Sequence, residues 1–253
     1  QRGDLDFLTE DLPLDVVNKI RAYLFHRGET LSLIDIGPVL RSVAAPENKA
    51  RAYRALVRTA AIVGELEICE DDELESIVSY WSAEGLNPNI SEFLDESVNR
   101  SRRTTYDLIH LLPPFPKQYL NTYPSLSDAN NFRTADCWWT AINFFEIDPS
   151  PRLLDPLPVN YFLQRNFERV EPPYKYGDLI LLYSTEGQDG ETLVHAYNHV
   201  FDDVVFSKNG RGMVQPWVLI RESDVLSLYS HTETERRVYR KLAPQARIVV
   251  NPS

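Results

Sequence analysis

A predicted β-hairpin in the last third of the chain constrains the fold more than any other feature. Residues 192–201 and 204–208 are rich in β-branched and aromatic side chains, and Asp202-Asp203 between them is a typical turn pair. An apolar run at 178–183 predicts a further strand before the hairpin. Strands joined by such short connections favour antiparallel pairing. The remaining elements expected in this half are strands at 215–220 and 247–250 and short helices at 159–166 and 221–229.

An apolar stretch with helical spacing precedes these strands and begins at Cys137. It runs to Phe145 and is apolar on nearly all sides, so we expect a buried helix. A cysteine in this position lies at a helix N-terminus, where free backbone N–H groups and the helix dipole favour its thiolate. A helix followed by antiparallel strands predicts an α+β fold for this half of the chain.

The first half of the chain has a different pattern. Apolar residues recur at helical spacing from Leu14 to Leu24 and from Pro46 to Leu66. We interpret the acidic stretch at 65–75 as a solvated helix end and turn. The expected organisation is an all-helical domain over 1–112, a break at the Pro-Pro-Phe-Pro of 113–116, and a second domain over 117–253.

Charge and hydropathy exclude several classes of partner. The chain carries a net charge of −11, and neither half has an excess of basic residues. We therefore expect no nucleic-acid partner and no attraction to anionic membranes. No apolar run reaches the roughly 18 residues needed to span a bilayer. The chain begins at Gln1 rather than Met, which is compatible with a cleaved export signal, so we favour an extracytoplasmic (secreted or periplasmic) location.

Two cysteines and five histidines limit the chemistry. Cys69 and Cys137 cannot form a cysteine-based metal site, and Cys69 has no neighbouring base in the sequence. His195 and His199 lie on one predicted strand, but no third ligand is suitably spaced, so we expect no metal and no cofactor. Cysteine catalysis needs a base beside the thiol. Along the strand that carries both of these histidines, alternation places His195 and Tyr197 on one face.

The hairpin register decides which polar residue shares the face of His195. A two-residue turn at 202–203 pairs residue 201 with 204 and gives His195 the neighbours Lys208 and Gly210. A three-residue loop at 202–204 pairs residue 201 with 205 and brings Asn209 to that face instead. We prefer the second register, because an amide can hold an imidazole in position.

The order of these features resembles the NlpC-like branch of the papain-like cysteine peptidases. Asp136-Cys137 at a helix start is similar to the family's nucleophile, and Gly177-Asp178-Leu179 is similar to its Gly-Asp-Leu strand. A histidine strand and a hairpin that ends in a polar residue follow in the family's order. The resemblance covers roughly residues 117–229. It implies a papain-like domain in which a helix that carries the cysteine packs on an antiparallel sheet.

The resemblance also implies roles for individual residues. Cys137 would be the nucleophile, His195 the general base, and Asn209 the polar third member of a triad. Trp138-Trp139 stand where the family usually has Ser-Gly, so the expected substrate groove is more closed or more apolar, or the indoles are extra core packing. Four residues are expected to line the substrate site: Tyr123, Asp136, Trp138 and Tyr197.

The expected function is cysteine-dependent amide hydrolysis, with cell-wall peptides as the substrate that the resemblance suggests. His195-Ala196-Tyr197-Asn198 is also similar to the histidine strand of transglutaminase-like proteins, which implies acyl transfer as an alternative. A papain-like module without catalytic activity is the third possibility. In each enzymatic case the Cys137 thiolate would attack an amide carbonyl and His195 would protonate the leaving amine.

Overall fold

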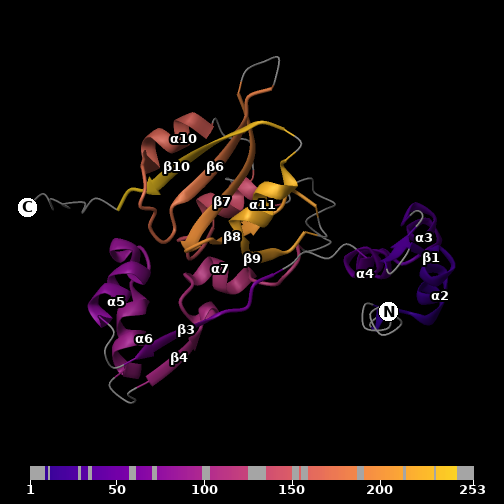
Figure 1. Ribbon diagram of the computed structural model, residues 1–253, viewed down its shortest axis with the longest axis horizontal. Helices are drawn as coiled ribbons and strands as arrows, with labels where there is room; N and C mark the ends of the chain where they lie inside the picture. Colours follow the sequence, from indigo (N-terminus) through magenta and orange to yellow (C-terminus); the bar gives the residue numbers. More distant parts are fainter. Residues whose placement is uncertain are drawn as a thin grey trace, which may run out of the picture.

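The structure is a computed structural model of the 253-residue chain. It describes residues 9–10, 12–27, 30–33, 36–56, 61–69, 73–98, 103–124, 135–149, 154, 159–186, 191–212, 215–230 and 232–243. Helices and strands both contribute to each half of the chain (Figure 1).

A six-stranded antiparallel sheet forms the centre of the second half, in the order β5-β10-β6-β7-β8-β9 (Figure 1). The expected α+β class and antiparallel sheet are confirmed, and four of the strands fall where the sequence predicts them. The strands are β5 (Phe167–Arg169), β6 (Leu179–Ser184), β7 (Thr192–Phe201), β8 (Val204–Lys208), β9 (Trp217–Arg221) and β10 (Thr234–Lys241).

Strand β10 is not predicted by the sequence, because its residues are mostly charged. Ion pairs compensate these charges: Arg237 binds Glu235 at 2.7 Å, and Arg240 binds Asp178 at 2.8 Å. The only fully apolar side chain of the strand, Val238, is 4% exposed and packs into the core. The strand expected at 247–250 lies outside the described residues.

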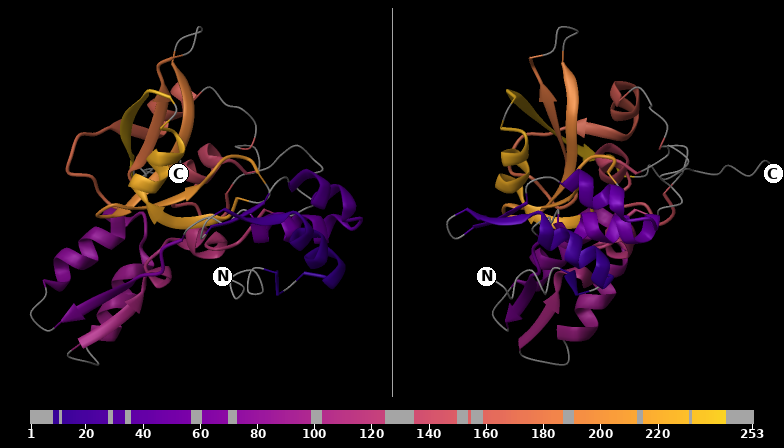
Figure 2. Two further views of the ribbon diagram at one scale, coloured as in Figure 1. Left: turned by 45° about the vertical axis from the view of Figure 1, so that its right-hand side comes forward. Right: turned by 90° about the vertical axis from the view of Figure 1, so that its right-hand side faces the viewer.

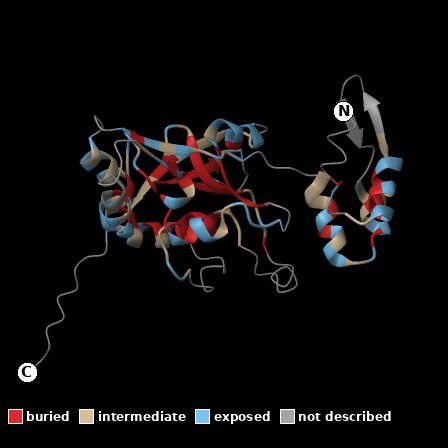
Figure 3. Ribbon diagram, turned by 90° about the horizontal axis from the view of Figure 1, so that it is seen from below, coloured by how far each residue is buried: buried red, intermediate tan, exposed pale blue. Residues whose placement is uncertain are grey.

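Helices cover both faces of the sheet. On one face lie α9 (Cys137–Ile142) and α10 (Val159–Asn166), and on the other lies α11 (Glu222–Leu228). Alternation along β7 separates the two cores: Ala196 packs with α9, whereas Tyr197 packs with Val225 of α11. Buried residues accordingly follow the sheet and the helices against it (Figure 3).

The β7–β8 hairpin differs from both predicted registers. Phe201 pairs with Val204 across the two-residue turn, but a bulge then shifts the pairing, so that His199 faces Val205. One extra residue in β7 therefore moves every later residue of β8 by one position relative to the simple two-residue turn. Ser207 and Asn209 come to the side of His195. Asn209 therefore lies on the face of His195, as in the preferred register, but the three-residue loop of that register is wrong.

The expectation of an all-helical first half is wrong, because this region also contains two small antiparallel sheets. Leu66 and Ile68 alternate with the acids of the stretch interpreted as a helix end, which is the period of a strand. Ile68 is 3% exposed and enters the core. The strands are β1 (Leu24–Arg27), β2 (Thr30–Leu33), β3 (Glu65–Cys69) and β4 (Arg103–Asp107).

The helices of the first half belong to two groups. The first group has a small core of its own, around Val16, Ile20 and Val39, and lies apart from the sheet (Figures 1 and 2). It consists of α2 (Leu14–Ala22), α3 (Ile36–Ser42) and α4 (Pro46–Leu56). The second group consists of α5 (Leu74–Ser82), η1 (Ala83–Gly85), α6 (Asn89–Val98), η2 (Leu108–His110) and α7 (Pro114–Tyr119).

The second group shares its core with the sheet. Trp81 of α5 and Phe115 of α7 belong to the same buried cluster as Phe206 of β8 and Trp217 of β9. The hydrophobic core therefore crosses the domain boundary predicted at 113–116. In the described part of the chain, no helix is long and apolar enough to cross a membrane.

Candidate active site

Cys137 is the first residue of α9, as the sequence predicts, and the preceding residue caps the helix. The Asp136 carboxylate accepts the backbone N–H of Trp139 at 2.8 Å, and its other oxygen lies 3.2 Å from Arg211. Residues 143–145 form a turn, so the helix ends three residues earlier than expected. The start of α9 packs against β7, the strand that carries His195.

The thiol is not poised as a thiolate in this arrangement. Burial raises the pKa of Cys137, and the Asp136 carboxylate raises it further. Backbone N–H groups of Ala196, Trp138 and Cys137 itself act in the opposite direction. The lowered pKa expected for a thiol at a helix N-terminus is therefore wrong, because desolvation of the charged sulfur outweighs the stabilisation by the N–H groups. The thiol needs a base that removes its proton.

His195, the base expected from the sequence, lies on the face of β7 opposite α9 and has a hydrogen-bond partner at one ring nitrogen. Its Nε2 lies 3.0 Å from the Ser207 hydroxyl oxygen, and that hydroxyl is 3.5 Å from the Asn209 side-chain oxygen. If Ser207 donates to Asn209, Nε2–H donates to Ser207, and Nδ1 carries the free electron pair. Nδ1 is buried and has no partner among the described residues. Burial lowers the pKa of His195 to about 4, so the ring is neutral at neutral pH.

Tyr229 is a direct neighbour of the His195 ring. Its ring stacks on His195 with a centroid distance of 4.9 Å and an interplanar angle of 24°. Burial, together with the charge on Cys137, raises the pKa of Tyr229 to about 12. Tyr229, which follows α11, therefore interacts with the His195 ring by stacking and with the thiol through its charge. Within the described residues, no hydrogen bond joins the Cys137 thiol directly to the His195 ring.

Two residues of this site are missed by sequence reasoning: Ser207 and Tyr229. The register preferred from the sequence already brings the odd-numbered positions of β8 to the face of His195, so alternation from Asn209 would have indicated Ser207. Lys208 was expected on the side of His195 in one register, but the structure places it on the α9 side, over the ring of Trp217. Nothing in the sequence pattern connects Tyr229 to a catalytic site.

The residues expected to line a substrate groove have structural contacts instead. Trp138 is 8% exposed and packs edge-on against Phe162, so the indole is part of the core. Tyr197 is 0% exposed, and its hydroxyl donates to Glu222 at 2.8 Å. Asp136 is the helix cap described above. The fourth of these residues, Tyr123, lies under the guanidinium of Arg54 at 4.2 Å.

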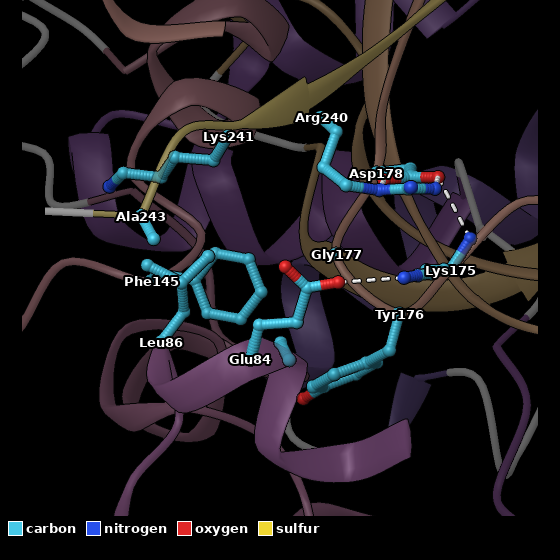
Figure 4. A pocket seen from close by; sticks show the side chains of 11 residues that line it. Glu84, Leu86, Phe145, Lys175, Tyr176, Gly177, Asp178, Arg240, Lys241 and Ala243 are labelled. Carbon is cyan, nitrogen blue, oxygen red and sulfur yellow. Dashed lines mark hydrogen bonds and ion pairs between the residues drawn. The ribbon is translucent and has the colours of Figure 1, made fainter. Parts of the chain in front are cut away.

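The Gly177-Asp178 pair lies beside a small pocket past the C-terminal end of α9, away from Cys137 (Figure 4). Gly177 has a φ of 84°, and a Cβ there would come within 2.1 Å of the Phe145 ring. Asp178 is buried and accepts two hydrogen bonds of 2.8 Å from Arg240. The motif therefore holds the turn after α9 and strand β10 in place.

No cluster of three or more His, Cys, Asp or Glu among the described residues could hold a metal ion. Comparison of the chain with protein-family models, with curated proteins and with solved structures found no match. The functional interpretation therefore depends on the geometry around Cys137 and His195.

Proposed function

We propose that the protein is a cysteine-dependent amide hydrolase in which Cys137 is the nucleophile and His195 the general base. The arrangement of His195 carries the proposal: one ring nitrogen is held by Ser207, and the other is buried with a free electron pair. A buried donor or acceptor without a partner is costly, so such an atom is retained where a function uses it.

The contacts of the thiol support the same role. The backbone N–H of Ala196, the residue next to His195 in β7, favours the charged form of the Cys137 thiol, and burial together with the charge of the thiol raises the pKa of Tyr229, on which His195 stacks. In the proposed reaction, the backbone N–H groups that act on the sulfur would also stabilise the oxyanion that forms during acyl transfer. The raised pKa of the thiol fits a mechanism in which the proton leaves only when the base removes it.

The proposed reaction has two steps. In the first, the Cys137 proton moves to Nδ1 of His195, the sulfur forms a bond with the amide carbon, and the C–N bond breaks as His195 returns the proton to the leaving amine. In the second, water attacks the thioester carbon and gives a proton to His195, the C–S bond breaks, His195 returns the proton to the sulfur, and the acid and the free thiol are released. Ser207 and Asn209 orient the ring throughout.

Peptides are the proposed substrates, with cell-wall peptides first among them on the basis of the NlpC-like resemblance. The burial of Trp138 and Tyr197 removes these two side chains from the proposed groove. Asp136 positions the nucleophile through its cap and does not itself bind substrate in this proposal.

A papain-like module without catalytic activity is the competing proposal. One observation favours it: the pKa of Cys137 is raised and that of His195 is lowered, so both groups are neutral in the free protein. Activity would then require substrate binding to bring the thiol and the ring into contact.

Activity screening distinguishes the proposals. The wild-type protein would be incubated with a panel of wall-type and ordinary peptides, and the products would be identified by mass spectrometry. Cys137→Ala should abolish hydrolysis, whereas Cys69→Ala should retain it, because Cys69 is an exposed thiol of β3. A labelled primary amine in the same reactions reports acyl transfer, the transglutaminase-like alternative. Absence of any product that depends on Cys137 would contradict the enzymatic proposal and leave the binding module.

A further inference from the structure

Two hollows adjoin each other where the turn after α5 meets the segment before β6. The larger hollow has a volume of about 280 Å³, and hydroxyl-bearing residues of α5 line it together with Glu84 and Lys175. The smaller hollow, of about 30 Å³, is the pocket of Figure 4, and its apolar lining includes Leu86, Phe145 and Ala243. Glu84 and Lys175 line both hollows, so their ion pair lies at the boundary between a polar and an apolar space.

The pair of Glu84 and Lys175 is the ion pair that a ligand could replace most easily here. Its atoms are 2.6 Å apart, but the two side chains are 62% and 53% exposed, and so open a pair contributes little to stability. The hydrogen bond from Lys175 lowers the pKa of Glu84, so the carboxylate is charged at neutral pH. The neighbouring cations, Arg240 and Lys241, each bind a carboxylate of their own. One negative and one positive charge, side by side, are therefore accessible to a ligand.

The backbone that presents Glu84 is strained. Ala83, Glu84 and Gly85 have φ angles of 48°, 56° and 92°, and this left-handed region is unfavourable for residues with a Cβ. Asn87, which is buried, holds the turn by donating its side-chain N–H groups to two backbone carbonyls at 3.1 Å. Glycine at position 84 would adopt the same conformation without strain. Strain of this kind is retained where a function uses the side chain.

We propose that the two hollows form a binding site for a free α-amino acid with a short aliphatic side chain, which replaces the ion pair of Glu84 and Lys175. The ligand's carboxylate binds the Lys175 ammonium, and its ammonium binds the Glu84 carboxylate. Its side chain enters the smaller hollow, which has room for about two water-sized groups. Neither hollow includes Cys137 in its lining, so the site is independent of the proposed reaction.

The charges of the site favour a zwitterion over other small molecules. One exposed ion pair is exchanged for two charge-assisted contacts with the ligand, so opening the existing pair costs little. A ligand with a single charge would meet a repulsive group, because an anion also faces Glu84 and a cation also faces Lys175. The site therefore selects both charges of the ligand together.

Isothermal titration calorimetry of the full chain with L-alanine tests the proposal. We expect saturable one-to-one binding. Propionate and ethylamine, which each lack one of the two charges, should bind at least about tenfold more weakly. L-Alanyl-L-alanine carries the two charges farther apart and should also bind more weakly, which distinguishes a site for a free amino acid from a site for a peptide. Absence of saturable L-alanine binding at millimolar concentration, or equal binding of any of the three analogues, would overturn the proposal.

Substitutions of the ion pair test the assigned contacts. Glu84→Gln and Lys175→Met each remove one charge and should weaken L-alanine binding at least about tenfold. Arg221→Met is the matched control, because it breaks an exposed ion pair with Asp203 outside both hollows and should leave the affinity unchanged.

Glu84→Gly separates binding from folding. This substitution relieves the strained backbone, so the thermal unfolding midpoint should be at least that of the wild type, whereas L-alanine binding should be lost. Unchanged L-alanine binding in folded Glu84→Gly or Lys175→Met would overturn the proposal.

Discussion

The Nε2 atom of His195 lies 3.0 Å from the hydroxyl oxygen of Ser207, and the Nδ1 atom of the same ring is buried without a partner among the described residues. The hydroxyl of Ser207 continues to Asn209 at 3.5 Å. With Ser207 donating to Asn209, Nε2 of His195 carries the proton and Nδ1 the free electron pair. The serine between the histidine and the amide is therefore the residue on which the orientation of the His195 ring depends.

Replacement of Ser207 by alanine should impair both stability and turnover. The Nε2–H of His195 loses its acceptor in a buried site, which costs about 1–3 kcal/mol of unfolding free energy. Hydrolysis that depends on Cys137 should fall by up to about 10²-fold, because an unheld imidazole is a poor general base. Asn209→Ala should have a smaller effect, since its contact is longer. Ser227→Ala on α11 is the control, because that exposed hydroxyl only binds the Asp224 carbonyl; equal rates in Ser207→Ala and the control would contradict the prediction.

Acidification should destabilise the protein through His195. Its pKa in the folded protein is lowered to about 4, below its unfolded value of 6.5. The unfolded chain therefore binds more protons between these two pH values, and the stabilising contribution is complete above pH 6.5 and is lost as the pH falls toward 4. The slope from this residue is at most about 1.4 kcal/mol per pH unit. Denaturant unfolding over this range checks it, and His195→Gln should show a smaller slope than the wild type.

Gly177→Ala should destabilise the protein more than Gly85→Ala. Both glycines have positive φ, at 84° and 92°, so each substitution costs about 1–2 kcal/mol of backbone strain. Only at Gly177 would the new Cβ also collide with Phe145, whereas nothing lies within 4 Å at Gly85. Thermal unfolding of the two variants separates the steric cost from the strain. Equal losses would mean that Phe145 moves aside freely.

Arg240→Met should cost about 3–5 kcal/mol of unfolding free energy, because it leaves the buried Asp178 carboxylate without its counter-charge. The double variant Asp178→Asn, Arg240→Met removes that charge as well and should recover part of the loss. Arg221→Ala, which breaks an exposed pair with Asp203, should cost less than about 1 kcal/mol. A similar small loss for Arg240→Met in chemical denaturation would disprove the structural role assigned to Asp178.

Local sequence signals were sufficient for several elements of the second half. The turn at Asp202-Asp203, the strands on either side of it and the start of α9 at Cys137 all lie where the sequence predicts them. Turn chemistry, capping and apolar runs act over a few residues, so they can be read without knowledge of the rest of the chain. The same signals failed where the tertiary context decides, as for the ion-paired strand β10 and the acidic strand β3.

The sequence by itself determined that a cysteine begins a helix and that a histidine lies on a nearby strand. Only the tertiary structure decided what surrounds them. The bulge beyond His199 brings Ser207 to the ring, and burial sets the pKa directions of both groups. Neither the bulge nor the burial could be derived from the sequence alone, because register and desolvation depend on which segments pack together.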